Sequence, residues 1–243
     1  MNDVIKQLHE RKSVRVFTDR DISSEARNFI LNAAAQAPTA GNQQLYTILE
    51  ITDPQLKKRL SETCDNQPFI AEAKLVLVFC ADCQKWYDAF LGADCAPRKP
   101  GVGDLMLAVS DTNIAAQNAV VAAHSLGIGS CYIGDIMENC EIHRDLLHLP
   151  DYVFPAAMLV FGYPTEQQLE RKKPERADLK HIVHQNSYRH MDNQELRELF
   201  APRCDSRPYE DYMKAFCNRK YNSEFPVEMT RSVEAYLEKF LQK

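Results

Sequence analysis

The sequence has no uninterrupted apolar run long enough to cross a bilayer, and it has no excess of basic residues. With 29 Lys and Arg against 34 Asp and Glu, its formal net charge is −5. That balance argues against general binding to nucleic acid, since affinity for a phosphate backbone needs a basic surface. The first ten residues, "MNDVIKQLHE", lack the apolar core of a secretory signal. We therefore expect a cytoplasmic protein with neither a membrane nor a nucleic-acid partner.

Several common catalytic signatures are also missing. The sequence contains no HExxH motif, no GxSxG nucleophile elbow and no Walker loop. The segment "GIGSCYIGD", residues 127–135, has Tyr132 where a dinucleotide-binding fingerprint needs its third glycine, and an expected helix rather than a strand precedes it. His143 and His148 are five residues apart and share no helix face well. We therefore expect a bound cofactor, rather than a side chain, to supply any chemistry.

The eight cysteines do not indicate a disulfide framework, because the chain is large and carries no export signal. Cys80 and Cys83 form a CxxC motif, which is typical of thiol oxidoreductases or of half a zinc site. No second CxxC completes a zinc site, and no tryptophan precedes Cys80. We interpret both thiols as incidental and expect no bound metal, with a thiol oxidoreductase as the alternative.

The remaining patterns predict mixed helices and strands in one compact domain. Helices are expected over residues 3–10, 21–38, 54–63, 105–126, 141–147 and 227–242. Strands are expected over residues 45–52, 74–81 and 156–164, of which the last two are apolar throughout and therefore buried. Loops are expected over residues 37–44, 92–104 and 165–190. Because the composition changes near residue 190, we divide the chain into a domain of residues 1–190 and a C-terminal helical extension of residues 191–243.

Two basic clusters stand out on this acidic chain. "RKSVR", residues 11–15, places Arg11, Lys12 and Arg15 around Ser13, a donor set suited to a phosphomonoester. Residues 170–180 form the second cluster. The loop "APTAGNQQ" offers a hydroxyl and amides that could read the edge of a heterocycle. Taken singly, each of these stretches is better explained as a solvated loop or turn.

Taken together, the segments resemble the nitroreductase family of FMN-dependent oxidoreductases, and within it the oxygen-insensitive NADPH nitroreductases and NADPH-flavin oxidoreductases. The resemblance covers roughly residues 4–190. It follows the order "ERKSVRVFTDRDIS", "AAAQAPTAGNQQ", "CDNQPFIAEAKLVLVFCAD", "DTNIAAQNAVVAAHSLGIGSCYIGDI", "FGYP", "KPER" and "HIVHQNSY". It implies an α+β fold with a central, mostly antiparallel sheet flanked by helices, and a C-terminal extension that crosses a dimer.

The resemblance also implies a homodimer that holds two FMN molecules, each bound by residues of both subunits. The residues that match cofactor contacts are Arg11, Lys12, Ser13, Arg15, Pro38, Thr39, Asn42, Gln44, Gln67, Tyr132, Ile133, Gly134, Lys173 and Arg176. Of these, the two basic groups would take the phosphate side, Pro38 to Gln44 would come from the partner subunit, and Tyr132 to Gly134 would run beside the isoalloxazine. No side chain is expected to act as an essential catalytic acid.

The implied reaction passes a hydride from NADPH or NADH through FMN to planar acceptors, such as nitroaromatics, quinones and flavins, by a ping-pong mechanism. One departure lies beside the flavin segment, where Asp135 stands at a position at which close relatives often carry a second glycine. Two alternative functions would also use bound flavin. One is a storage or sensor protein without significant turnover, and the other is a different FMN reaction such as reductive dehalogenation.

Overall fold

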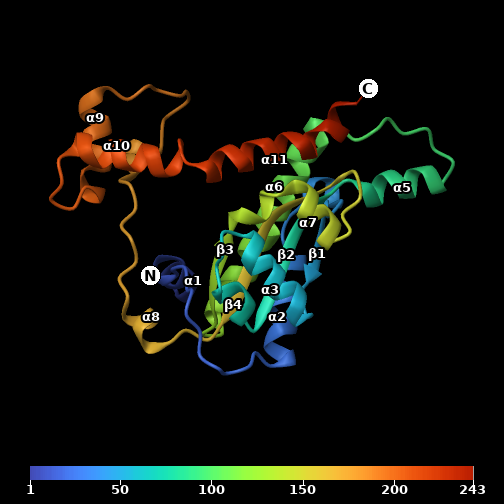
Figure 1. Cartoon of the computed structure of the whole chain (residues 1–243), viewed down its shortest axis with the longest axis horizontal. Helices are drawn as coiled ribbons and strands as arrows, with labels where there is room; N and C mark the ends of the chain where they lie inside the picture. The colour runs from blue at the N-terminus through green and yellow to red at the C-terminus, as the bar shows by residue number, and fades with distance from the viewer. Residues whose placement is uncertain (243) are drawn as a thin grey trace. The chain divides into compact units, whose positions relative to one another are not determined.

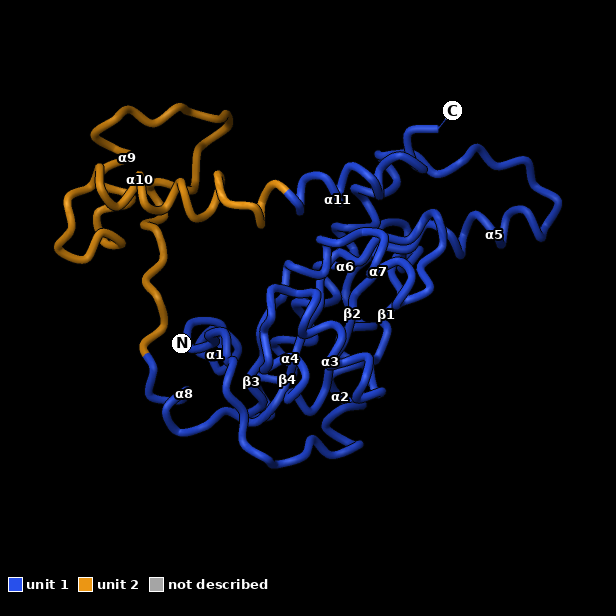
Figure 2. The backbone as a smooth tube through the Cα atoms, in the orientation of Figure 1, with its two compact units in different colours: residues 1–171, 228–243 blue, residues 172–227 orange. Residues whose placement is uncertain are grey.

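The computed structural model describes residues 1–242, which form two compact units shown in Figure 2. Unit 1 comprises residues 1–171 together with the chain from residue 228 onward, and unit 2 comprises residues 172–227. Each unit is described by itself. The division at residue 190, and the dimer role of residues 191–243, stay predictions.

Unit 1 is built on a four-stranded, fully antiparallel sheet in the order β1-β2-β4-β3 (Figure 1). The strands are β1 (Tyr46–Glu50), β2 (Leu75–Asp82), β3 (Gly129–Ile133) and β4 (Val153–Gly162). The expected α+β class and antiparallel sheet are thus confirmed. Strand β3 was not expected, because its sequence is punctuated by glycines. Strand β4 begins earlier than expected because the sheet register shifts opposite Pro155, which has no N–H to donate.

The helices of unit 1 before the C-terminal one are α1 (Asp3–Glu10), α2 (Ser24–Ala35), α3 (Pro54–Thr63), α4 (Phe69–Glu72), α5 (Gln84–Gly92), α6 (Val102–Ser125), α7 (Cys140–Leu146) and α8 (Glu166–Glu170). Two of these helices, α2 and α3, begin at a capping side chain. Ser23 Oγ accepts from Ala26 N–H at 3.2 Å, and Asp53 Oδ1 accepts from Gln55 N–H at 2.8 Å. The predicted loop over residues 92–104 ends early, because Asp104 accepts from Gly101 N–H at 2.8 Å and opens α6.

Unit 2 contains α9 (Asn193–Phe200) and α10 (Tyr209–Lys220). Helix α11 (Glu224–Leu241) starts in unit 2 and ends in unit 1. Short 3-10 helices cover Ala40–Asn42, Gly134–Met137, Leu179–His181 and Ala201–Arg203. The predicted loop over residues 165–190 is therefore not continuous, since α8 and one 3-10 helix interrupt it.

The sheet is covered on both faces, which explains why β2 is apolar along its whole length. Leu77 and Phe79 pack in a cluster with α2 and α6, whereas Val76 and Val78 pack in a second cluster with α3 and α11. Burial of both faces supplies the hydrophobic driving force for the fold.

Helix α6 is the long helix predicted from its nearly continuous apolar sequence. It buries a row of small side chains, Ala108, Ala115, Ala116, Ala119 and Ala123, against the sheet. It is not buried on all sides, however. In the single chain Met106, Leu107 and Ile114 remain exposed, so this helix carries an apolar surface that the fold of one chain does not cover.

Candidate functional site

The first basic cluster lies along the free edge of the sheet. Val14 N–H donates to Ser130 O of β3 at 2.9 Å, and Ser13 and Ser130 form a parallel bridge. On the other side, Arg15 N–H donates to Gln168 Oε1 of α8 at 3.2 Å. Residues 11–15 are therefore an extended segment whose neighbouring side chains point in opposite directions, held between β3 and α8.

Three polar side chains of this segment lie on the same side of it. Because neighbouring side chains of an extended segment alternate, Arg11, Ser13 and Arg15 share one side. Burial raises the pKa of the Cys131 thiol of β3, while Arg15, Ser13 and Arg11 act on it in the opposite direction. The Arg11–Ser13–Arg15 cluster therefore carries two guanidinium groups and a hydroxyl on one side of the segment, a donor set that suits a phosphate.

Lys12 lies in a different environment from Arg11, Ser13 and Arg15. Its ammonium group donates to Leu169 O at 2.6 Å and also to Arg171 O. Arg171 in turn donates through its guanidinium group to Ser13 O. These bonds tie residues 11–15 to the chain that follows α8, so in this structure Lys12 braces the segment through backbone carbonyls.

Within residues 1–242 the charge of the cluster is not neutralised by an ion pair. Among residues 1–242, no carboxylate forms an ion pair with Arg11, Lys12 or Arg15. In the same described part, Arg11 Nη1 is buried and has no hydrogen-bond partner. A buried donor without an acceptor costs free energy that an anion at this position would recover. The donor set and the unpaired nitrogen both fit the phosphate of FMN.

The loop that holds Pro38, Thr39, Asn42 and Gln44 is organised by a buried carboxylate. Asp111 of α6 accepts from Ala40 N–H at 3.0 Å and from Leu45 N–H at 3.4 Å. Thr39 Oγ1 accepts from Gln44 N–H at 3.1 Å. Asn42 and Gln44 adopt positive φ angles of 56° and 49°, and both residues are exposed. The loop is thus held firmly at its base while it presents amide side chains outward.

Sequence reasoning missed Asp111, although a signal was present. Asp111 is the single Asp, Glu, Lys or Arg within residues 105–126, and its side chain is buried in the structure. A lone carboxylate in an apolar helix needs donors nearby, and the loop over residues 39–45 supplies them.

The remaining predicted contacts of unit 1 are linked through one buried histidine. His143 Nδ1 lies 3.0 Å from Ile136 O, in the turn that starts at Gly134. His143 Nε2 lies 2.8 Å from Thr63 Oγ1. Burial lowers the pKa of His143, so the imidazole is neutral. Nδ1–H therefore donates to the carbonyl, and Nε2 is the acceptor, which faces Thr63 Oγ1 at 2.8 Å and Cys64 Sγ at 3.9 Å.

Gln67 joins the same network from the other end, since its Nε2 donates to Cys64 O at 2.8 Å, one residue beyond Thr63. The network thus connects Gln67 with the turn at Gly134. Before that turn, Ile133 is buried in β3, while Tyr132 is half-buried and its hydroxyl lies 3.4 Å from Gln117 Oε1.

An acidic cluster adjoins this turn. Glu138 is only 6% exposed, and within the described residues its Oε1 has no hydrogen-bond partner. Burial, together with the nearby carboxylates of Asp135, Asp65 and Glu228, raises the pKa of Glu138 to about 7. Glu228 stays charged, because Arg231 and Ser232 lower its pKa to about 2. The departure noted at Asp135 is therefore part of a larger negative patch.

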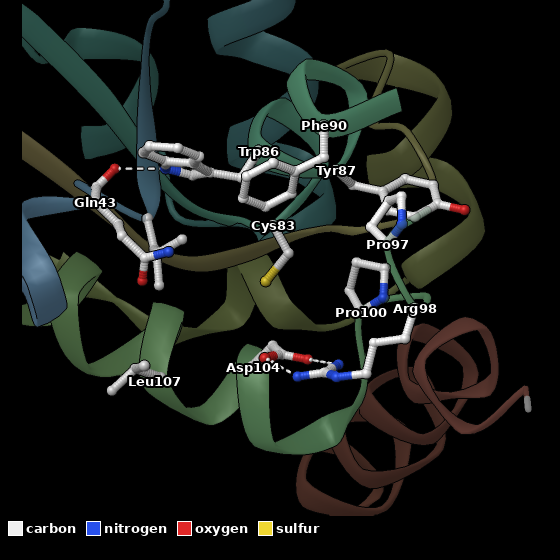
Figure 3. Close-up of a pocket in the computed structure, with 11 residues that line it drawn as sticks. Gln43, Cys83, Trp86, Tyr87, Phe90, Pro97, Arg98, Pro100, Asp104 and Leu107 are labelled. Carbon is white, nitrogen blue, oxygen red and sulfur yellow. Dashed lines mark hydrogen bonds and ion pairs between the residues drawn. The ribbon is translucent and has the colours of Figure 1, made fainter. Parts of the chain in front are cut away.

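Beside the loop over residues 39–45 lies an aromatic cavity of about 280 Å³ (Figure 3). It is lined by Gln43, Leu45, Cys83, Trp86, Tyr87, Phe90, Pro97, Arg98, Pro100, Asp104 and Leu107. Trp86 Nε1–H donates to Gln43 O at 2.8 Å, which connects the cavity to the loop. No sequence pattern indicated this cavity, because its walls come from Gln43, Leu45, Cys83, α5, the following loop and α6.

Lys173 and Arg176, the second predicted phosphate contacts, belong to unit 2. There they line one cavity with Lys172, Lys180, Arg203 and Arg219. Glu175, Asp178, Glu198 and Asp205 line the same cavity, so its charge is mixed and does not by itself indicate an anionic ligand. The assignment of Lys173 and Arg176 to the FMN phosphate stays a prediction.

The cysteines do not support thiol chemistry. All eight are free, and burial raises the pKa of both Cys80 and Cys83 to about 12. A thiol oxidoreductase needs a thiolate near neutral pH, which these two residues do not provide. Within residues 1–242 no group of His, Cys, Asp and Glu could hold a metal ion, and no helix there is long and apolar enough to cross a membrane.

Comparison with known proteins points to one family. The model of the family described as "Nitroreductase family" matches residues 8–163. The chain is 32% identical over 243 residues to "FMN reductase (NAD(P)H)" of Bacillus subtilis, covering 98% of this chain and 92% of that protein. It is 34% identical over 222 residues to "Oxygen-insensitive NADPH nitroreductase" of Salmonella typhimurium, covering 90% and 87%. The solved structure of B. megaterium NfrA2 matches with a TM-score of 0.82 at 29% identity, covering 96% and 98%.

Proposed function

We propose that this chain, which belongs to the nitroreductase family and is an FMN-dependent NAD(P)H oxidoreductase, reduces small planar acceptors such as nitroaromatics, quinones and flavins. The observation that carries the proposal is the Arg11–Ser13–Arg15 cluster, with its uncompensated charge and its buried, unpaired Arg11 Nη1. NADPH is the expected reductant because the similar Salmonella typhimurium protein is an NADPH nitroreductase.

In this proposal, different residues of the chain hold the phosphate end and the ring end of the cofactor. Arg11, Ser13 and Arg15 hold the phosphate end, and Lys12 keeps that segment in place through the carbonyls of α8 and the residue after it. Gln67 and Tyr132, Ile133 and Gly134 line the ring end. The assignment of Lys173 and Arg176, which belong to unit 2, to the phosphate stays a prediction from the family resemblance.

We infer a homodimer with two FMN sites. Pro38, Thr39, Asn42 and Gln44 reach the FMN of the partner subunit, which the exposure of Pro38, Asn42 and Gln44 permits, while Thr39 is half-buried. The uncovered side of α6, with Met106, Leu107 and Ile114, would be buried against the second copy. Apolar surface of this kind favours association because its burial removes it from water. Residues 191–243 would extend across the partner.

When bound, FMN would accept a hydride from NAD(P)H and pass it to an acceptor that takes the nicotinamide's place, in a ping-pong sequence. The chain's own contribution is to bind and orient. The guanidinium groups anchor the phosphate, and the buried His143 holds the turn at Gly134 against Thr63. No side chain is required as an essential acid, since position and charge account for the protein's part.

The test begins with the visible absorption spectrum of the protein as purified, followed by NADPH under anaerobic conditions. Flavin bands that bleach on addition support the cofactor and the reductant together. Bands that persist indicate the alternative of a flavin-binding storage or sensor protein. A colourless protein that cannot be reconstituted with FMN overturns the proposal, and product analysis with a nitroaromatic and a halogenated aromatic separates nitro reduction from dehalogenation.

A further inference from the structure

Glu138 lies in a position that a carboxyl side chain rarely occupies. It closes the turn formed by the short helix Gly134–Met137 and is 6% exposed. Its backbone N–H donates to Asp135 O at 3.0 Å, but within residues 1–242 its side-chain Oε1 has no hydrogen-bond partner. A buried carboxylate without a partner is unfavourable, and protonation relieves that cost.

The groups around Glu138 add negative charge. The turn packs against α3 and β4, and β4 has no titratable side chain. Three carboxylates act on Glu138, from Asp135 of the same turn, Asp65 after α3 and Glu228 of α11. Burial and these carboxylates together raise the pKa of Glu138 to about 7. The side chain therefore exchanges its proton near neutral pH, and all four groups belong to unit 1.

The other charged and titratable groups of these elements do not supply a counter-ion. Arg231 of α11 donates to Glu228 Oε2 at 2.8 Å and pairs with an exposed glutamate of α7, and in the described part of the chain no ion pair involves Glu138. Burial lowers the pKa of His143 and raises that of Cys64, so both stay neutral. A proton is the one cation that this surrounding leaves for Glu138.

This carboxyl adjoins the segment that the proposed function places beside the flavin ring. Asp135 follows Gly134 directly, and Glu138 ends the same turn. His143 Nδ1 lies 3.0 Å from Ile136 O, in the middle of that turn, and holds it in place. A charge that develops on the flavin ring would act on Glu138 through the protein interior, where charges are screened less than in water.

We propose that Glu138 takes up a proton from water when the bound flavin is reduced, and releases that proton when the flavin is reoxidised. A hydride carries two electrons and one proton, so its transfer leaves one additional negative charge on the flavin. The carboxylate of Glu138 binds one proton, becomes neutral and offsets that charge. The inference rests on the proposed function for the position of the flavin. It makes Glu138 a charge-compensating residue, which donates nothing to the acceptor.

Thermodynamic linkage allows a test that needs neither NADPH nor an acceptor. If reduction favours protonation of Glu138, protonation favours reduction to the same extent. The reduction potential of bound FMN is measured from about pH 5.5 to about pH 9, a range that spans the carboxyl's titration. Xanthine and xanthine oxidase supply the electrons, and a reference dye reports the potential. The parent is compared with Glu138→Gln, which keeps the side-chain shape and stays neutral.

At about pH 5.5 the parent's Glu138 is protonated in both redox states, so the two proteins should have the same potential. At about pH 9 it is ionised and opposes reduction. At an equal applied potential the parent should then hold roughly tenfold less reduced flavin than Glu138→Gln, which corresponds to a coupling of one pKa unit. Glu234→Gln, at an exposed position of α11, is the control and should follow the parent at every pH.

Asp65→Asn separates an electrostatic role from a structural one. Asp65 is exposed and has a positive φ of 61°, which asparagine also tolerates. Loss of its charge should lower the pKa of Glu138. With Asp65→Asn as the background, the potentials with and without Glu138→Gln should therefore separate at a lower pH. A separation that stays at the same pH would contradict the electrostatic origin.

Two outcomes distinguish failure of this inference from failure of the proposed function. A flavoprotein that NADPH bleaches, but whose potential Glu138→Gln leaves unchanged or shifts equally at every pH, overturns the inference and retains the function. A protein that binds no FMN overturns the proposed function, and the inference with it.

Discussion

Val14 and Gly129 are in contact so close that a side chain on Gly129 has no room. A Cβ atom built on Gly129 would lie 2.6 Å from Val14 Cγ2 and 2.8 Å from Val14 Cβ. Val14 is buried and stands in the middle of the segment that carries Arg11, Ser13 and Arg15. The glycine therefore allows the basic segment to lie directly against β3.

Gly129→Ala should for this reason displace the basic segment and weaken FMN binding. We expect an increase of about tenfold or more in the FMN dissociation constant, the loss of roughly one charge-assisted contact. Titration of apoprotein with FMN, followed by quenching of flavin fluorescence, gives the constant. Gly129→Ala combined with Val14→Gly removes both Cγ2 and Cβ of residue 14 and so restores the space, and this double variant should bind more tightly than the single one. Equal weakening in both would contradict this explanation.

Arg11→Ala should weaken retention of FMN more than it alters the hydride step, because the guanidinium group anchors the phosphate. A charged hydrogen bond contributes about 1.5–3 kcal/mol, which corresponds to roughly ten- to a hundredfold in the dissociation constant. The measurement is FMN loss on dialysis, together with the rate of flavin reduction by NADPH at saturating FMN. Lys12→Ala is the comparison, since that ammonium group is bonded to backbone carbonyls. An Arg11→Ala protein that holds FMN like the parent would exclude the phosphate assignment.

Asp111→Ala should loosen the loop over residues 39–45. Ala40 N–H and Leu45 N–H would lose their buried acceptor, at a cost of about 1–3 kcal/mol in the free energy of unfolding. Asn113→Ala, an exposed position on the same helix, is the control and should change stability little. Urea denaturation of the apoprotein measures both. If the two variants unfold at the same urea concentration, the carboxylate does not hold the loop.

The parts of the fold that sequence patterns predicted are those set by local chemistry. The caps at Ser23 and Asp53 are recognisable because the side chain bonds to its own helix. Strand β2 is recognisable because burial of both faces leaves no polar position in "LVLVFCA". Strand β3 was not predicted from the sequence. Its Gly129 is required by the close contact with Val14, a neighbour distant in the sequence.

In the candidate site, too, the sequence predicted the features that depend on nearby residues and missed those that depend on distant ones. The basic segment was visible, since Arg11, Ser13 and Arg15 are close in sequence and alternate along an extended chain. The sequence did not predict the different environment of Lys12, because its partner Leu169 lies 157 residues further along the chain. The link from His143 to Thr63 and the aromatic cavity likewise depend on contacts between distant elements, which no local pattern encodes.

Glu138 makes stability depend on pH. Its folded-state pKa of about 7 lies above the ordinary value of 4.5. Below about pH 4.5 the carboxyl is protonated in both states and costs nothing. As pH rises from 4.5 to 7 the unfolded state releases the proton first, so the free energy of unfolding falls by up to about 3 kcal/mol. Above pH 7 the full cost is present.

Glu138→Gln should therefore stabilise the protein at pH 8 and have little effect at pH 4.5. Thermal unfolding of the apoprotein across this range gives the difference in Tm at each pH. Glu234→Gln, at an exposed position of α11, is the control, and its effect should not vary with pH. A Glu138→Gln effect that is the same at both ends of the range would mean that Glu138 titrates normally.

The Thr63 hydroxyl offers the sharpest test of the link between Gln67 and the turn at Gly134. Thr63→Val keeps the shape of the side chain but leaves the buried His143 Nε2 without its 2.8 Å partner, at a cost of about 1–3 kcal/mol. Thr63→Ser retains the hydroxyl. Since the imidazole also holds Ile136 O, we expect Thr63→Val to raise the FMN dissociation constant several-fold and Thr63→Ser to stay near the parent.

Two measurements separate positioning from simple loss of stability. Urea denaturation reports the stability of each apoprotein, and the flavin absorption maximum of each holoprotein reports the surroundings of the ring. A purely structural role would lower stability in Thr63→Val without moving the absorption maximum. A shifted maximum that Thr63→Ser restores would mean that the hydroxyl acts through His143 on the turn at Gly134, because neither Thr63 nor His143 belongs to the predicted flavin contacts.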